Sequence, residues 1–178
     1  SAKQGTQLDT LLEAIAPRAS CMYRPQRNAM MDVLIRRGRQ RFAKEQIPRD
    51  NVRALVRSLR DNCAVVYLPD QTYLGKQSEL APFFGEPAVT NTATSKLASI
   101  SGARVLPYFF RRLPDGTYRV DIGAPPLGFP SDSPLADTRR LFGLLEYYIR
   151  LAPEQYLWLY KKFKGRPPPL PDPYASPL

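Results

Sequence analysis

Three stretches of this sequence combine residue types that packing alone does not explain. The first places basic residues at both ends of one expected helix, with Tyr-Arg-Pro-Gln-Arg-Asn at 23–28 and Arg-Arg-Gly-Arg at 36–39. The second, residues 67–88, follows an apolar run of strand length, the position at which α/β sheets place binding crevices. The third, residues 153–167, mixes aromatic rings with cations, which suits the boundary between an apolar phase and anionic headgroups and also suits nucleic acid.

The sequence contains no histidine, and this excludes several kinds of site. Ser-His-Asp and Cys-His nucleophile pairs, His-Glu-x-x-His metal sites and a histidine general base are all ruled out. Cys21 and Cys63 have no Cys-x-x-Cys spacing, so they indicate neither a disulfide framework nor a zinc site, and a reducing compartment is favoured. No Gly-rich phosphate loop occurs. We therefore expect no metal and no cofactor.

Apolar periodicity predicts the elements that position these stretches. The alternation indicates an α/β sandwich with a mixed, mostly parallel sheet flanked by helices. Residues 63–68 and 104–110 are expected to be strands buried on both faces, and a turn at 113–117 to close an edge hairpin. Gly38 is expected to supply a left-handed helix cap. The predicted helices are 8–16, 28–38, 48–59, 90–101 and 133–153, and the predicted strands are 20–24, 63–68, 104–110 and 118–122.

Length and composition indicate one folded domain. The 178 residues carry a formal charge of +10 and are 43% hydrophobic, which is ordinary for a globular chain. No apolar run approaches the ~18 residues that cross a bilayer. Because the chain starts at Ser1 without a methionine and runs directly into a helical pattern, we expect a domain over 1–166 that is incomplete at its N-terminus. Prolines dominate 167–178 and favour an extended polyproline II tail.

Five segments, in order, closely resemble the bacterial lipid A late acyltransferases, the lauroyl and myristoyl transferases of the lysophospholipid-acyltransferase superfamily. They are YRPQRNAMMDVLIRRGR, YLPDQTY-G, PFFGEPAVT, VLPYFFRRLPDGTY and APEQYLWLYKKFKGRP, and the resemblance covers residues 9 to 167. It implies a glycerolipid-acyltransferase-like α/β fold with an N-terminal membrane anchor at the cytoplasmic face of the bacterial inner membrane. It also implies transfer of a fatty acyl group from acyl carrier protein to a hydroxyl of a lipid A precursor.

The catalytic motif of that family is His-x-x-x-x-Asp/Glu, shortly before the Tyr-Arg-Pro segment. By resemblance Asp9 matches the carboxylate, whereas Gln4 stands at the histidine position. An amide does not act as a base near neutral pH, so the contribution of the histidine, typically ~10²–10⁴-fold, should be missing. Three interpretations stay open: an inactivation that leaves binding intact, a damaged or incomplete sequence at this boundary, or a misalignment in which Asp9 only caps or solvates a helix.

The resemblance also assigns substrate-binding residues. Arg39 matches an arginine near the active site that would hold a phosphate or the developing oxyanion, the alternative being a solvated helix end. Asp70 would bind sugar hydroxyls or position cations, or else form a turn after Pro69. Arg111 and Arg112 would lie near acceptor phosphates, the alternative being surface charges on a hairpin. Tyr23, Arg24 and Asn28 would surround the site behind the residues that contact the substrate.

Two other classes of function compete with the acyltransferase. The Gln4 substitution favours a pseudoenzyme that binds lipid or carrier protein without turnover. A nucleic-acid binder has only the basic charge and the mixing of aromatic and basic residues in its favour, and no known nucleic-acid motif is present. We therefore expect an acidic carrier protein, a phosphorylated glycolipid and a membrane surface as partners, and no nucleic acid. In this hypothesis Asp9, Arg39 and Asp70 surround one cavity.

Overall fold

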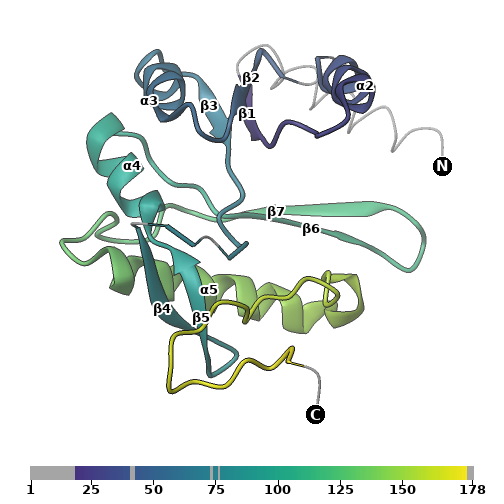
Figure 1. Ribbon diagram of the computed structural model, residues 1–178. Helices are drawn as coiled ribbons and strands as arrows, with labels where there is room; N and C mark the ends of the chain where they lie inside the picture. Colours follow the sequence, from purple (N-terminus) through teal and green to yellow (C-terminus); the bar gives the residue numbers. More distant parts are fainter. Residues whose placement is uncertain (1–18, 41–42, 73, 76, 176–178) are drawn as a thin grey trace. The chain divides into compact units, whose positions relative to one another are not determined.

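The computed structural model describes residues 19–40, 43–72, 74–75 and 77–175, which fall into two compact units (Figure 1). The N-terminal unit comprises the described residues up to Leu68 together with Ser101 to Ala103. The C-terminal unit comprises Pro69 to Ile100 and the described residues from Arg104 onward. Gln4, Asp9 and the predicted helix at 8–16 lie outside the described residues.

The N-terminal unit is a parallel three-stranded sheet with the strand order β2-β1-β3. Its register pairs Met22 with Ile47 and Ser20 with Val65. Ile47, Leu55 and Ser20 are its largest fully buried side chains. Its elements are β1 (Ala19–Tyr23), α2 (Ala29–Arg39), β2 (Glu45–Pro48), α3 (Val52–Arg60) and β3 (Ala64–Val66).

Asparagine caps decide where the two helices of this unit begin. The Asn28 side chain accepts hydrogen bonds from the amides of Met30 and Met31, at 3.0 and 3.2 Å. Asn51 does the same for Ala54, so α3 begins at Val52 and the predicted start at Pro48 is wrong, because Pro48 ends β2. The predicted cap at Gly38 is also wrong, since α2 continues through that residue to a cap at Gln40.

The apolar run at 63–68 forms a shorter strand than its composition indicates. Only Ala64–Val66 pair with β1. Ala64 and Val66 are exposed in this unit, so the expectation of burial on both faces is wrong.

The C-terminal unit contains two antiparallel ribbons and the long helix α5. The ribbon formed by β4 and β5 packs on α5, as Figure 1 shows. The core of the unit gathers Phe83, Ala81, Ala88, Phe142 and Ile149. Its elements are β4 (Ser78–Phe83), β5 (Glu86–Asn91), α4 (Ala93–Ser101, up to Ile100 in this unit), β6 (Tyr108–Arg112), β7 (Tyr118–Ile122), α5 (Pro134–Leu151) and the 3₁₀ turn η2 (Pro153–Gln155).

Local signals at α5 and at the β6–β7 turn are confirmed. The Ser133 hydroxyl caps α5 by accepting from the Ala136 amide at 3.2 Å, and Pro134 opens the helix. The turn at 113–117 closes with the Leu113 amide donating to the Thr117 carbonyl at 2.7 Å. Helix and parallel sheet together confirm the mixed α/β fold.

Three other expectations for this unit require correction. Thr90 and Asn91 belong to β5, so the helix predicted at 90–101 begins only at Ala93. The strand predicted at 104–110 is displaced to Tyr108–Arg112, and it is not buried on both faces, because Phe110 is 67% exposed. The proline-rich tail forms turns at 167–170 and 172–175 in place of one extended helix. None of the helices in the described part of the chain is both long and apolar enough to cross a membrane.

Candidate functional site

The segment around Asp70 is fastened to an aromatic and basic segment near the C-terminus. We call residues 69–75 (excluding Tyr73) the Asp70 segment and residues 156–166 the aromatic–basic segment. The buried ammonium of Lys162 donates to the backbone carbonyl of Asp70. The Thr72 amide donates to the Tyr160 hydroxyl at 2.8 Å, and the Thr72 hydroxyl donates to the Lys162 carbonyl at 2.7 Å. Three hydrogen bonds therefore hold this loop in one position.

A close backbone approach extends the same contact. Gly165 has a φ of +73°, and a Cβ built on it would lie 2.7 Å from Cδ2 of Leu74. The positive φ favours glycine at this position, and a side chain here would require the exposed Leu74 side chain to turn away.

The Asp70 carboxylate lies within electrostatic reach of three titratable groups. Burial, then Asp70, then Tyr160 raise the pKa of Tyr156 to about 12. Burial and then Asp70 also raise the pKa of Tyr108. The phenols are therefore neutral near pH 7, and they can donate hydrogen bonds beside a carboxylate that can accept them.

Lys162 is the buried cation of this site, with 3% of its surface exposed. Its ammonium lies 4.5 Å from the ring centroid of Phe142 and 5.4 Å from that of Phe83. Burial lowers the pKa of Lys162 to about 8, although the Asp70 charge acts to raise it. The cost of desolvation therefore exceeds the attraction of the carboxylate.

An unusual two-residue turn lies beside two aromatic rings, since the ring centroid of Phe84 is 4.9 Å from that of Phe83 and 6.0 Å from that of Trp158. Phe84 and Gly85, with φ of 50° and 82°, join β4 to β5. The Phe84 amide donates to Glu146 Oε1 at 2.8 Å, and the Arg150 guanidinium lies 4.8 Å from the ring centroid of Phe84. Tertiary contacts therefore hold a phenylalanine in a conformation that usually favours glycine or asparagine.

Arg111 and Arg112 line a hollow of about 560 Å³ in the C-terminal unit. Gln155 also lines this hollow, and its side chain is bonded twice to the backbone of Arg112. Its Oε1 accepts from the Arg112 backbone amide at 2.8 Å, and its Nε2 donates to the Arg112 carbonyl at 2.9 Å. The buried Nε of Arg111 has no hydrogen-bond partner among the described residues. The hollow thus offers cationic hydrogen-bond donors, which suit a phosphate.

The predicted residues of the N-terminal unit lie at the ends of β1 and α2. Arg39 ends α2 and is exposed. Burial raises the pKa of the Cys21 thiol, and the charge of Arg39 acts in the opposite direction by lowering this pKa. Arg24 is exposed just after β1. Asn28 has a structural role as the cap of α2.

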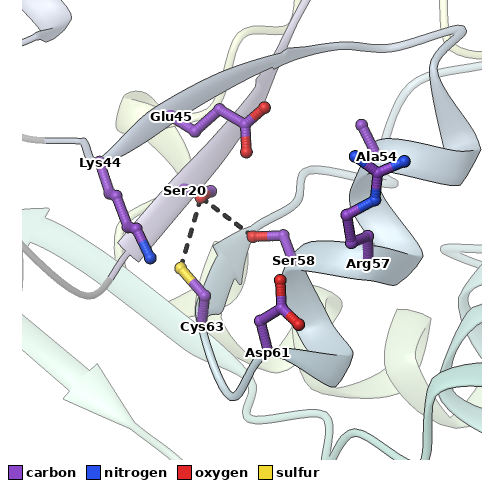
Figure 2. Close-up of a pocket in the computed structure, with 8 residues that line it drawn as sticks. All are labelled: Ser20, Lys44, Glu45, Ala54, Arg57, Ser58, Asp61 and Cys63. Carbon is purple, nitrogen blue, oxygen red and sulfur yellow. Dashed lines mark hydrogen bonds between the residues drawn. The ribbon is translucent and has the colours of Figure 1, made fainter.

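A small pocket of about 80 Å³ also occurs in the N-terminal unit (Figure 2). The Ser58 hydroxyl donates to the Ser20 hydroxyl at 3.1 Å, and Ser20 Oγ lies 3.4 Å from the thiol of Cys63. The rim carries both signs of charge, from Lys44, Arg57, Glu45 and Asp61. The pocket is too small for an acyl chain, and the two cationic and two anionic residues that line it favour neither sign of ion.

The structure brings some of the predicted site residues together within the C-terminal unit. Asp70 is joined to the aromatic–basic segment, and Arg111 and Arg112 share a hollow. Gln4 and Asp9 lie outside the described residues, and Arg39 belongs to the other unit. The cavity shared by Asp9, Arg39 and Asp70 therefore stays a prediction.

Sequence reasoning missed the roles of Lys162, Thr72 and Tyr160. Within Tyr-Lys-Lys-Phe-Lys, nothing distinguishes the one lysine that is buried from its two exposed neighbours. Tyr156 packs against the core, whereas Trp158 is 56% exposed.

Comparison with known protein families identifies the class to which the chain belongs. The sequence profile of the bacterial lipid A biosynthesis acyltransferases matches residues 9–165, so the chain belongs to this family. The match confirms the resemblance drawn from the sequence; it begins at Asp9 and does not reach Gln4.

Curated relatives agree with the profile. The chain is 36% identical over 155 residues to the lipid A biosynthesis lauroyltransferase of Escherichia coli (strain K12), covering 86% of this chain and 51% of that protein. It is 40% identical over 147 residues to the palmitoleoyltransferase of the same strain, covering 82% and 48%. It is 32% identical over 171 residues to the myristoyltransferase, covering 92% and 51%. The chain thus spans about half the length of these relatives.

Proposed function

We propose that this chain belongs to an enzyme that moves a fatty acyl group from acyl carrier protein to a hydroxyl of a lipid A precursor. In this reaction the hydroxyl oxygen attacks the thioester carbonyl carbon, a C–O bond forms and the C–S bond breaks. The hydroxyl proton passes to a base and ends on the carrier thiol, so the products are an ester and a free thiol. The observation that carries the proposal is the family match over residues 9–165.

The described residues suit an acceptor that carries phosphates and hydroxyls. Asp70 would accept hydrogen bonds from sugar hydroxyls, because its loop is held in place and its carboxylate lies near neutral phenols. Arg111 and Arg112 would hold an acceptor phosphate, since both line one hollow and guanidinium groups are cationic hydrogen-bond donors. Arg39 would hold a phosphate or the oxyanion; Arg24 and Asn28 belong to the same N-terminal unit, and Asn28 caps the opposite end of α2.

The family resemblance implies the partners and the location, and the charge of the chain suits anionic partners. A basic chain with a charge of +10 attracts an acidic carrier protein and anionic headgroups. The cytoplasmic face of the bacterial inner membrane is the location that the family resemblance implies, and a basic surface suits anionic headgroups there.

A second candidate is a pseudoenzyme that binds the glycolipid or the carrier without turnover. The observation that favours it is Gln4, which stands where the family base is expected. Binding by Asp70 and the arginines does not require that base, so the two candidates differ in turnover and agree in binding.

Restoring the base separates the two candidates. Gln4→His should raise acyl transfer ~10²–10⁴-fold, the usual contribution of a general base. The assay mixes acyl carrier protein, loaded with a radiolabelled fatty acyl group, with a phosphorylated lipid A precursor in detergent micelles. It measures the radiolabel that is transferred to the glycolipid. Gln7→His is the matched control, because it adds the same imidazole three residues away. Unchanged turnover in Gln4→His would reject the loss of the base as the explanation, and retained binding of both substrates without product would support the pseudoenzyme.

A further inference from the structure

The buried lysine of the aromatic–basic segment has no role in the chemistry described above, yet it touches the Asp70 segment directly. A lysine with 3% exposure is costly to bury, and the fold places its ammonium against two rings and one backbone carbonyl. That carbonyl belongs to Asp70 itself. The charge is therefore directed at the backbone of the residue whose side chain is assigned to the acceptor.

We propose that Lys162 is a positioning residue that fixes the Asp70 segment and thereby aims the Asp70 carboxylate at the acceptor. The inference rests on the proposed function for the acceptor role of Asp70, and on the contacts alone for the fixing of the loop.

Neighbouring contacts show why one lysine has this effect. Thr72 is bonded twice to the aromatic–basic segment, once through its amide to Tyr160 and once through its hydroxyl to the Lys162 carbonyl. Lys162 therefore contacts the loop from both its side chain and its backbone. Loss of the ammonium removes the bond that reaches the Asp70 carbonyl. Among the described residues, the Thr72 bonds and the bonds between Gly75 and Ser78 at the end of the segment then remain.

The mechanical part of the proposal is tested by hydrogen exchange. In Lys162→Met, whose side chain has a similar length and no charge, the Thr72 amide should exchange about tenfold faster, because local opening becomes easier. Lys161→Met is the matched control, since Lys161 is exposed and its ammonium lies over the Tyr174 ring, 5.4 Å from the centroid. Equal exchange at Thr72 in Lys162→Met and the unmodified chain would overturn the proposal.

The functional part is tested by equilibrium binding, which does not require turnover. The probe is the phosphorylated lipid A precursor in detergent micelles, and acyl carrier protein is measured in parallel. Lys162→Met should weaken glycolipid binding about tenfold and leave carrier binding unchanged, and Asp70→Asn should weaken glycolipid binding by a similar factor. The double variant should bind no more weakly than Asp70→Asn alone, because Lys162 acts through Asp70.

The outcomes separate the proposal from the proposed function. Additive losses in the double variant would overturn the positioning role, because Lys162 would then contribute independently. Full glycolipid binding by Asp70→Asn would overturn the acceptor role of Asp70 and the functional half of the proposal, even with faster exchange at Thr72. In Gln4→His, which restores the base, Lys162→Met should raise KM for the glycolipid and leave KM for the carrier unchanged.

Discussion

Replacing Lys162 by methionine should change how the stability of the C-terminal unit depends on pH. Burial lowers the pKa of the ammonium from 10.5 to about 8 in the folded chain. Between these two values the unfolded chain binds more protons than the folded chain, so the unmodified protein becomes more stable as pH rises. Methionine does not titrate, and Lys162→Met should lack this gain.

The magnitude follows from the two pKa values. Below about pH 7 the ammonium is charged in both states, and the cost of burying it is fully present. Between pH 7 and pH 9.5 the folded protein releases that proton first, which adds about 2 kcal/mol to the free energy of unfolding. Tyr156, whose pKa is raised to about 12, and Tyr108, whose pKa is also raised, stay neutral in this range. The free energy of unfolding of the unmodified chain minus that of Lys162→Met should therefore increase by about 2 kcal/mol.

The assay is urea denaturation followed by the fluorescence of Trp158, the single tryptophan of the sequence. Trp158 reports on the correct region, because its ring centroid lies 4.9 Å from that of Tyr156 and 6.0 Å from that of Phe84. Lys161→Met should track the unmodified chain at every pH. A difference that stays flat would show that Lys162 is not desolvated. A difference that falls as pH rises would show that the attraction of Asp70 exceeds the cost of burial.

Three further substitutions test other parts of the fold. Gly165→Ala should lower the free energy of unfolding by about 1–2 kcal/mol because of its positive φ alone, since the Leu74 side chain is 65% exposed and can turn away. Gly128→Ala, at a φ of +64° with open space around it, is the control and should lower it by the same amount in denaturation followed by Trp158 fluorescence. A much larger loss of stability at Gly165 would contradict this. Asn28→Ala should lower the free energy of unfolding by about 1 kcal/mol by circular dichroism, whereas Asn28→Asp keeps the cap. Burial favours a higher pKa for Asp137, but hydrogen bonds from Ser95 and Ser131 outweigh it and lower the pKa. Asp137→Asn should therefore cost about 1–3 kcal/mol at neutral pH, and this loss should shrink in denaturation curves recorded below about pH 4; a loss independent of pH would contradict the lowered pKa.

Elements with local signals could be predicted from the sequence. Helix α5 carries a serine cap, a proline at its first position and a proline beyond its end, all of which act within a few residues. The turn at 113–117 has the Asp-Gly pair that favours a tight connection. These features are determined by residues close to them in sequence, and the tertiary packing is compatible with them.

The ribbon formed by β4 and β5 could not be predicted in this way. Pro82 and Pro87 face each other across it, and proline normally argues against a strand. Its turn uses Phe84 at a positive φ, which no local rule favours. The Glu146 carboxylate that accepts the hydrogen bond from the Phe84 amide belongs to α5 and lies 62 residues away in sequence. The contact that stabilises the positive φ of Phe84 therefore cannot be recognised from the sequence of the turn.

The same limit applies to the basic residues that suggested an anionic partner. The net charge of +10 gives every cation the same weight. In the folded units, some cations make internal contacts and others are exposed to solvent. Lys162 is directed at a carbonyl inside the fold, and Arg166, with its side chain 6% exposed, lies 3.3 Å from Glu86. Arg24 and Arg39 present their charges to solvent. Only cations of this second kind can meet a phosphate without breaking an internal contact, so the attraction for an anionic partner depends on where the charges lie and is weaker than their sum implies.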